Sequence, residues 1–155
     1  MMFVRAYPRE TQEMVFDAHD RAFAFFGGAC TRGIYDNMKT AVDRVRPGKV
    51  REVNAKFTAM ASHYLFDTEF CNPASGWEKG QIEKNVRDSR NRLWQLAPAV
   101  RSLVELNDWL AHQCVLLWQQ VRHPEQDATI WEVWSQERAH LMPVGQPFDG
   151  YVEHT

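Results

Sequence analysis

The sequence is poor in several features that would place a protein in a special class. Its cysteines, Cys30, Cys71 and Cys114, are odd in number and lie about forty residues apart, without the close pairs of a zinc site or a redox motif. We therefore expect reduced, mostly buried thiols. The chain also lacks an apolar run near the roughly 20 residues of a membrane-spanning helix, and its N-terminus lacks the apolar stretch of a signal peptide. These absences predict a cytoplasmic protein with no membrane partner.

A large excess of charge is missing as well, because the 155 residues carry a net charge of −2. This balance argues against a simple polyanion binder, but the charges are unevenly distributed. Residues 32–101 contain 13 Lys or Arg against 8 Asp or Glu, whereas the remaining residues contain 5 against 12. The middle of the chain is therefore the part that could face phosphates, unless its basic groups are merely solvated surface charges.

What is present is a pattern of strands alternating with helices, in a chain whose 45% hydrophobic content fits one domain with a core. Apolar runs bounded by turn residues indicate strands, and apolar positions at helical spacing indicate amphipathic helices. The expected strands cover residues 3–7, 29–35 and 65–71, and the expected helices cover residues 11–26, 50–64, 75–94, 102–121 and 129–140. The end of the chain, residues 143–155, contains Pro and Gly and is predicted to be a tail or linker.

Capping residues support several of these helix boundaries. Thr11 can cap the first helix, and Gly27 can end it. Capping boxes are expected for Ser75 with Glu78 and for Ser102 with Glu105, and either Asp127 or Thr129 can cap the last helix.

Two carboxylates occupy suggestive positions. Asp36 follows the strand over residues 29–35, at the carboxyl end where α/β sheets place ligand-binding side chains, and Glu83 lies near the start of a helix. Each has an ordinary alternative, because Asp-Asn is a common turn former and Glu83 could pair with Arg87 on a helix surface. Glu78 competes with Glu83 as the acid of this helix, but its capping position already explains it.

Longer stretches of sequence are more specific than these single residues. They are Phe3-Val-Arg-Ala-Tyr-Pro-Arg9, Gly33-Ile-Tyr-Asp-Asn-Met-Lys-Thr-Ala-Val42, Ser62-His-Tyr-Leu65, Gly76-Trp-Glu-Lys-Gly-Gln-Ile-Glu83 and Trp131-Glu-Val-Trp-Ser-Gln-Glu-Arg138. In this order they closely resemble the integrase-type catalytic core of IstA-type insertion-sequence transposases and the helical stretch that follows it. The resemblance covers nearly the whole chain.

The resemblance implies an α/β, ribonuclease-H-like core and a DDE enzyme, in which three acids hold two Mg²⁺ ions for DNA cleavage and strand transfer. Asp36 matches the second acid of that family and Glu83 the third, so both are expected to be catalytic and to bind the metal. Carboxylates are the ligands that Mg²⁺ prefers, and a pair of ions can stabilise the attacking and leaving oxygens.

The family's first acid and first two strands would precede residue 1. The expected organisation is therefore a partial integrase core over residues 1–100, a helical extension over 101–142 and a tail or linker over 143–155. Those strands would lie in the centre of the sheet, so we expect the chain to fold poorly alone or to expose strand edges. We also expect that this chain does not cut or join DNA by itself.

A basic stripe is predicted beside Glu83. Lys79, Glu83, Arg87 and Arg90 follow one another at helical spacing, and their basic groups could contact DNA phosphates, with Lys39 as a weaker candidate. A solvated, salt-bridged helix face is the alternative. The resemblance further implies DNA ends and target DNA, other transposase subunits in a homo-oligomer, and an ATP-dependent helper protein as partners.

Three other functions remain open at this point. The chain could be a non-catalytic remnant that still binds DNA or transposase subunits, and its DNA affinity would then be indifferent to Asp36→Asn. A ribonuclease-H-like nuclease would cleave without joining. An unrelated α/β interaction domain would make the basic middle of the chain incidental.

Overall fold

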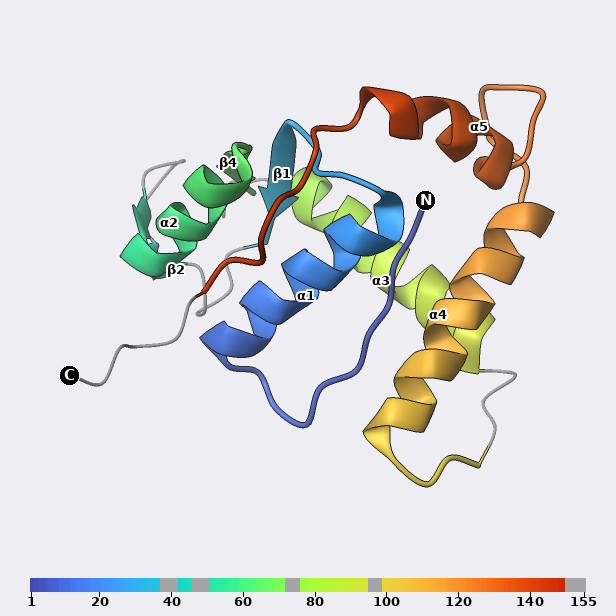
Figure 1. Cartoon of the computed structure of the whole chain (residues 1–155), viewed down its shortest axis with the longest axis horizontal. Helices are drawn as coiled ribbons and strands as arrows, with labels where there is room; N and C mark the ends of the chain where they lie inside the picture. Colours follow the sequence, from blue (N-terminus) through green and yellow to red (C-terminus); the bar gives the residue numbers. More distant parts are fainter. Residues whose placement is uncertain (37–41, 46–50, 72–75, 95–98, 150–155) are drawn as a thin grey trace.

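The structure, a computed structural model, describes residues 1–36, 42–45, 51–71, 76–94 and 99–149, which form a mixed α/β arrangement (Figure 1). Within helix α3, side chains are described from Lys84 to Leu93. The elements in chain order are α1 (Gln12–Phe26), β1 (Arg32–Tyr35), β2 (Val42–Val45), β3 (Arg51–Val53), α2 (Ala55–Tyr64), β4 (Asp67–Phe70), α3 (Gly76–Trp94), α4 (Leu103–Gln120), α5 (Ile130–Glu137) and a short 3₁₀ turn, η1 (Arg138–His140).

Helix α1 begins and ends where the sequence predicts. The Thr11 side chain accepts a hydrogen bond from the Met14 amide at 3.3 Å, which satisfies one of the free N–H groups of the first turn. Gly27 ends the helix in the left-handed conformation, with φ of 84°. The amides of Gly27 and Gly28 both donate to the Phe23 carbonyl, at 3.0 and 2.9 Å.

A βαβ unit follows α1. Strands β1 and β4 pair in parallel, with Arg32 opposite Asp67 and Tyr35 opposite Phe70. Helix α2 belongs to the stretch of chain that links the two strands. Both strands were predicted, although each is shorter than expected. Parallel strands need a crossover connection of this kind, because a tight turn would make the second strand antiparallel to the first.

The helix predicted over residues 50–64 begins later than expected. Asn54 caps α2, and its side-chain oxygen accepts hydrogen bonds from the Lys56 and Phe57 amides at 2.9 and 3.3 Å. Val53, assigned to the helix stripe, belongs instead to β3, which pairs antiparallel with β2. The apolar spacing of Val53 fits both periods, and the cap at Asn54 decides between them. Val50 lies outside the described residues.

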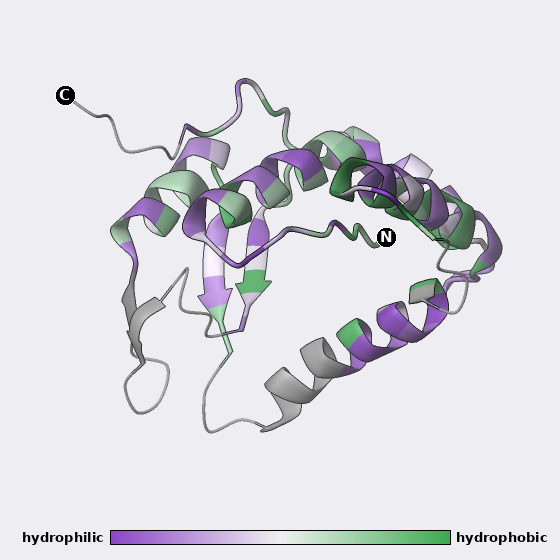
Figure 2. Cartoon of the chain, turned by 90° about the horizontal axis from the view of Figure 1, so that it is seen from below, coloured by the Kyte–Doolittle hydropathy of each residue, from purple (hydrophilic) through white to green (hydrophobic). Residues whose placement is uncertain are grey.

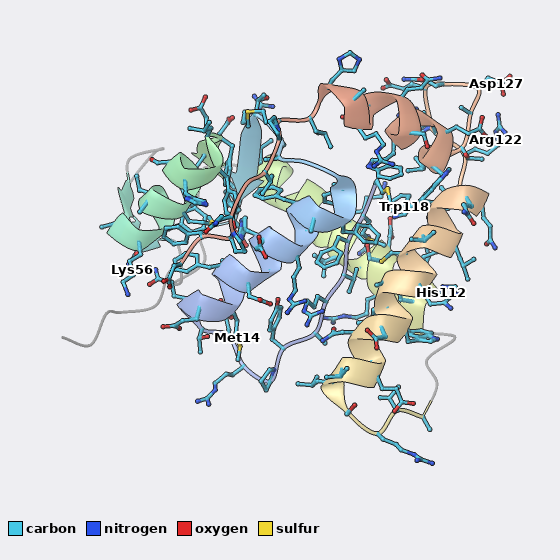
Figure 3. The ribbon with its side chains drawn as sticks, in the orientation of Figure 1. Met14, Lys56, His112, Trp118, Arg122 and Asp127 are labelled. Atoms are coloured by element: carbon cyan, nitrogen blue, oxygen red, sulfur yellow. The ribbon has the colours of Figure 1, made fainter. Side chains whose placement is uncertain are left out.

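The strand predicted over residues 3–7 is wrong, because this segment has irregular structure. Its polar backbone groups bind side chains of α4 instead of another strand. Asn107 accepts from the Ala6 amide at 2.7 Å and donates to the Ala6 carbonyl at 3.0 Å, and Trp118 donates to the Met2 carbonyl at 2.8 Å. Trp118 points from α4 toward this segment in Figure 3.

The buried core lies between α1, α2 and the parallel strand pair. Its members are mostly aromatic: Phe16, Phe23, Ala29, Phe57, Met60, Ala61, Tyr64, Phe66 and Phe70. Residues 142–148 lie against this core, although the sequence assigned residues 143–155 to a tail or linker. Met142 forms a two-way backbone bridge with Ala29, both bonds being 2.9 Å, and Val144 and Phe148 pack on the cluster.

Helices α4 and α5 form a helical unit after the core (Figure 1). The Ser102 side chain caps α4, but the Glu105 carboxylate accepts from the Arg101 amide instead of completing the expected box. Thr129 and Glu132 form a reciprocal capping box at the start of α5, which settles the choice between Asp127 and Thr129. Asp127 pairs with Arg122 in the connecting loop (Figure 3).

Cys71 and Cys114 are buried as predicted, and burial raises the pKa of the Cys114 thiol, whereas Cys30 is exposed. Among the described residues, no helix is both long and apolar enough to cross a bilayer. Figure 2 shows that the described turns of α3 are mainly hydrophilic, with residues 1–7 running between α1 and α3.

Candidate functional site

Asp36 lies directly after β1, at the edge of the sheet where both parallel strands end. The Tyr35 carbonyl accepts a hydrogen bond from the Cys71 amide at 2.9 Å, so the two strand ends are joined up to this point. Asp36 is half-buried. A carboxylate at the carboxyl end of a parallel strand can face a ligand while the strand holds its backbone in place.

The residue before Asp36 is tied to α1 through a histidine. His19 Nε2 lies 2.9 Å from the Tyr35 hydroxyl, and His19 Nδ1 lies 2.7 Å from the Val15 carbonyl. Burial lowers the pKa of His19, although the hydrogen bond to Val15 partly opposes this, and burial raises the pKa of Tyr35. Both side chains are therefore neutral near pH 7.

Sequence reasoning missed His19. The helical stripe of α1 contains a signal for it, because His19 lies four residues after Val15 and therefore on the apolar face of the helix. A histidine at such a position must find hydrogen-bond partners inside the core.

For Glu83, the second predicted acid, the structure describes the helical backbone but not the side chain. Glu83 and Lys79 belong to α3, as expected, but their side chains lie outside those that the structure describes. Lys39 also lies outside the described residues. Arg87 and Arg90 are on α3 and are exposed. The structure thus does not test whether Asp36 and Glu83 come together.

A cavity of about 470 Å³ separates α3 from the N-terminal segment. Apolar side chains of Phe3, Val4, Val86 and Leu93 line it, together with Arg5 and Arg90 among its polar residues. The Arg5 Nε atom is buried without a hydrogen-bond acceptor, and it lies 3.9 Å from an Asp17 carboxylate oxygen. Sequence reasoning did not single out Arg5, although the stretch over residues 3–9 contains it.

Comparison with known proteins places this arrangement in a wider context. No protein-family model matches the chain. A transposase for insertion sequences IS1326/IS1353 from Pseudomonas aeruginosa is 61% identical over 152 residues, which are 98% of this chain and 30% of the relative. A transposase from Aminobacter aminovorans is 57% identical over the same shares of the two chains. A transposase for IS21 from P. aeruginosa is 36% identical over 84 residues, covering 54% of this chain and 21% of the relative.

The chain belongs to the IS21 (IstA-type) family of transposases. It spans about 30% of the length of the curated relatives that it matches over 98% of its own residues. The resemblance drawn from sequence stretches is therefore confirmed at the level of the family.

The described side chains contain no group of three His, Cys, Asp or Glu residues that could hold a metal ion. Asp36 has the hard oxygen donors that Mg²⁺ prefers, so the donor type fits. The number of donors does not fit, because the described side chains place no two further metal-binding groups beside Asp36.

Proposed function

We propose that this chain forms part of the catalytic core of a DDE transposase with a ribonuclease-H-like architecture. The observation that carries the proposal is the position of Asp36 at the carboxyl end of β1, in a parallel βαβ unit followed by the helix that contains Glu83. This order agrees with the family's order of a strand with its acid, a helix, a strand and a helix with its acid. The ancestral reaction is Mg²⁺-dependent DNA cleavage and strand transfer.

Asp36 and Glu83 are the residues that would hold Mg²⁺ in the complete site. When bound, Mg²⁺ neutralises charge at the phosphate and favours the attack of an oxygen on the phosphodiester. The contribution of the chain itself is positional: β1 fixes the backbone before Asp36, and α3 presents Glu83 on a rigid element. The proposed site needs a third acid, which neither Asp36 nor Glu83 supplies, so we expect no strand transfer from this chain alone.

Arg87 and Arg90 would contact the DNA backbone. Both are exposed and lie three residues apart on α3, so they occupy neighbouring positions on the helix surface, C-terminal to Glu83. Such contacts position the duplex without reading its sequence. Other transposase subunits and an ATP-dependent helper protein are further proposed partners, on the basis of family membership alone.

The metal proposal can be tested with Mn²⁺ as a paramagnetic probe. In NMR spectra of the 155-residue chain, Mn²⁺ should broaden the signals around Asp36, and Asp36→Asn should greatly reduce this broadening. Asp67→Asn is the matched control, because Asp67 is also on the strand pair but at its opposite end. Equal broadening in the wild type and in Asp36→Asn would contradict a metal role for Asp36.

Glu83 needs its own pair of variants. Glu83→Gln should weaken Mn²⁺ binding, whereas Glu78→Gln, on the same helix, should leave it unchanged. If Glu78→Gln has the larger effect, the assignment of the second acid on α3 is wrong.

A second candidate function is DNA binding without catalysis, which the exposed arginines of α3 favour. Fluorescence anisotropy with element-end DNA at several salt concentrations would test it. Replacing both Arg87 and Arg90 by Gln should reduce the slope of log K against log salt by about 2, since each phosphate contact contributes about 1. Arg101→Gln is the control, because this exposed residue lies outside α3. DNA affinity that is unchanged by Asp36→Asn, without any Mn²⁺ effect at Asp36, would favour the non-catalytic function.

A further inference from the structure

We propose that His19 and Tyr35 form a positioning pair, which fixes the carboxyl end of β1 where Asp36 is attached. The inference rests on the proposed function, in which Asp36 is a metal-binding acid. Neither residue of the pair would touch the metal or the DNA. They act through the backbone that carries Asp36.

The hydrogen bonds of His19 define a direction. The Val15 carbonyl can only accept, so His19 Nδ1 is the donor across the 2.7 Å contact. In the neutral ring Nε2 is then an acceptor, and the Tyr35 hydroxyl donates to it at 2.9 Å. The backbone of α1 thus selects one tautomer of His19, and that tautomer holds the Tyr35 hydroxyl.

Aromatic rings enclose the pair on several sides. The His19 ring is nearly parallel to that of Phe66, at 5° with centroids 6.3 Å apart, while Phe57 meets Tyr35 edge-to-face at 87° and 5.0 Å. Phe70 also contacts Tyr35, with centroids 5.7 Å apart. Close packing of this kind leaves the Tyr35 ring few alternative positions.

Gly33 makes room for this conformation. A Cβ atom at Gly33 would lie 2.6 Å from the Tyr35 hydroxyl oxygen and 2.8 Å from Cε2 of the same ring. The Tyr35 side chain therefore lies over Gly33, along its own strand, on its way to His19. A side chain at position 33 would push it away.

The Tyr35 side chain belongs to one end of the strand pair, so a loss of its hydrogen bond can affect the two ends differently. The Cys71 amide donates to the Tyr35 carbonyl at 2.9 Å, next to Asp36, whereas the Asp67 amide donates to the Thr31 carbonyl at 3.0 Å at the other end. A positioning role predicts that loss of the Tyr35 hydroxyl loosens the Cys71 end. A role in overall stability alone predicts that both ends respond equally.

Amide hydrogen exchange in the 155-residue chain, followed by NMR, distinguishes these cases. Tyr35→Phe removes only the hydroxyl and should speed exchange of the Cys71 amide about two- to tenfold relative to Asp67. Tyr64→Phe is the matched control, because it removes another buried hydroxyl, which accepts from the Phe148 amide at 2.9 Å. It should leave the ratio of the two exchange rates unchanged. An unchanged ratio in Tyr35→Phe would overturn the proposal.

Variants of His19 test the other half of the pair. Gln at position 19 can place an acceptor where Nε2 lies, so His19→Gln should retain much of the wild-type exchange ratio. His19→Leu cannot accept a hydrogen bond and should match Tyr35→Phe. If His19→Gln and His19→Leu change the ratio equally, the hydrogen bond does not carry the effect and the proposal fails.

The Mn²⁺ experiment separates this proposal from the proposed function. If Mn²⁺ broadens the Asp36 signals in the wild type and less in Tyr35→Phe, the pair positions a metal-binding acid. If the exchange ratio changes as expected but Mn²⁺ does not affect Asp36, Asp36 has no metal role. The pair then still fixes the end of β1, but it does not position a metal-binding acid.

Discussion

At the scale of single residues, the ordering of β1 depends on a glycine as much as on the side chains around it. Tyr35 reaches His19 only because Gly33 has no Cβ atom. Glycine normally weakens a strand, so its presence inside β1 needs a reason such as this close approach. The space above Gly33 and the hydrogen bond at His19 are parts of one local arrangement.

Gly33→Ala is expected to destabilise the chain by about 1–3 kcal/mol, because the new methyl group would displace a ring that is packed on several sides. The free energy of unfolding in urea measures the effect. Gly145→Ala is the control, since a Cβ atom there has no neighbour within 4 Å. Equal stability of the two variants would show that Tyr35 can move without cost.

The burial of His19 predicts a pH dependence. Its pKa is lowered in the folded chain, so below its ordinary pKa of 6.5 the unfolded chain takes up a proton that the folded chain does not. The free energy of unfolding should therefore be unaffected by His19 above about pH 7. It should fall below pH 6.5, by at most about 1.4 kcal/mol per pH unit for this one group.

The comparison that isolates this effect is the wild type against His19→Gln, measured by urea unfolding between pH 5 and pH 8. Carboxylates titrate in both proteins, so their contributions cancel in the difference. The wild type should lose more stability than the variant as the pH falls from 7 to 5. Parallel curves would mean that His19 is not buried as a neutral group.

At the scale of elements, the N-terminal segment shows how a side chain can take the place of a strand. Asn107 is buried and satisfies both polar backbone groups of Ala6, as a neighbouring strand would. Asn107→Ala would leave these groups unpaired and should cost about 1–3 kcal/mol.

Hydrogen exchange at the Ala6 amide and urea unfolding together measure this cost. Gln119→Ala is the matched control, because Gln119 is exposed on the same helix. Ala6 exchange should accelerate only in the Asn107 variant. Similar behaviour of both variants would show that water replaces the Asn107 amide without loss.

The sequence predicted elements well where local signals agree and poorly where the partner is remote. Thr11 and Gly27 delimit α1 because capping depends on neighbouring residues. Residues 3–7 have a strand composition, yet their backbone binds Asn107, about one hundred residues away, which no local pattern reveals. Asp36 was placed correctly at the end of β1, whereas His19 was missed because its partner Tyr35 becomes a neighbour only through packing.

At the scale of the whole molecule, the chain after η1 returns to the core near α1 and α2. The Phe148 ring meets Phe16 edge-to-face at 5.1 Å, the Phe148 amide donates to the Tyr64 hydroxyl at 2.9 Å, and His63 Nε2 lies 2.7 Å from the Gln146 carbonyl. Residues 142–148 therefore connect the helical unit of α4 and α5 to the domain core by contacts as well as by the chain.

Phe148→Ala tests whether these contacts couple the two parts. Phe148 is half-buried, so the loss of its ring should cost about 1–3 kcal/mol of unfolding free energy, less than for a fully buried phenylalanine. Phe148→Leu should recover most of that loss, and Val104→Ala, at a side chain that is 71% exposed, should change little. NMR signals of Trp134, which packs under Arg138 near the start of the segment, report on the helical unit, and those of Phe57 report on the core. If residues 142–148 couple the helical unit to the core, both signals should change at one urea concentration in the wild type and at two different concentrations in Phe148→Ala. A single shared transition in the variant would show that other contacts hold the two parts together.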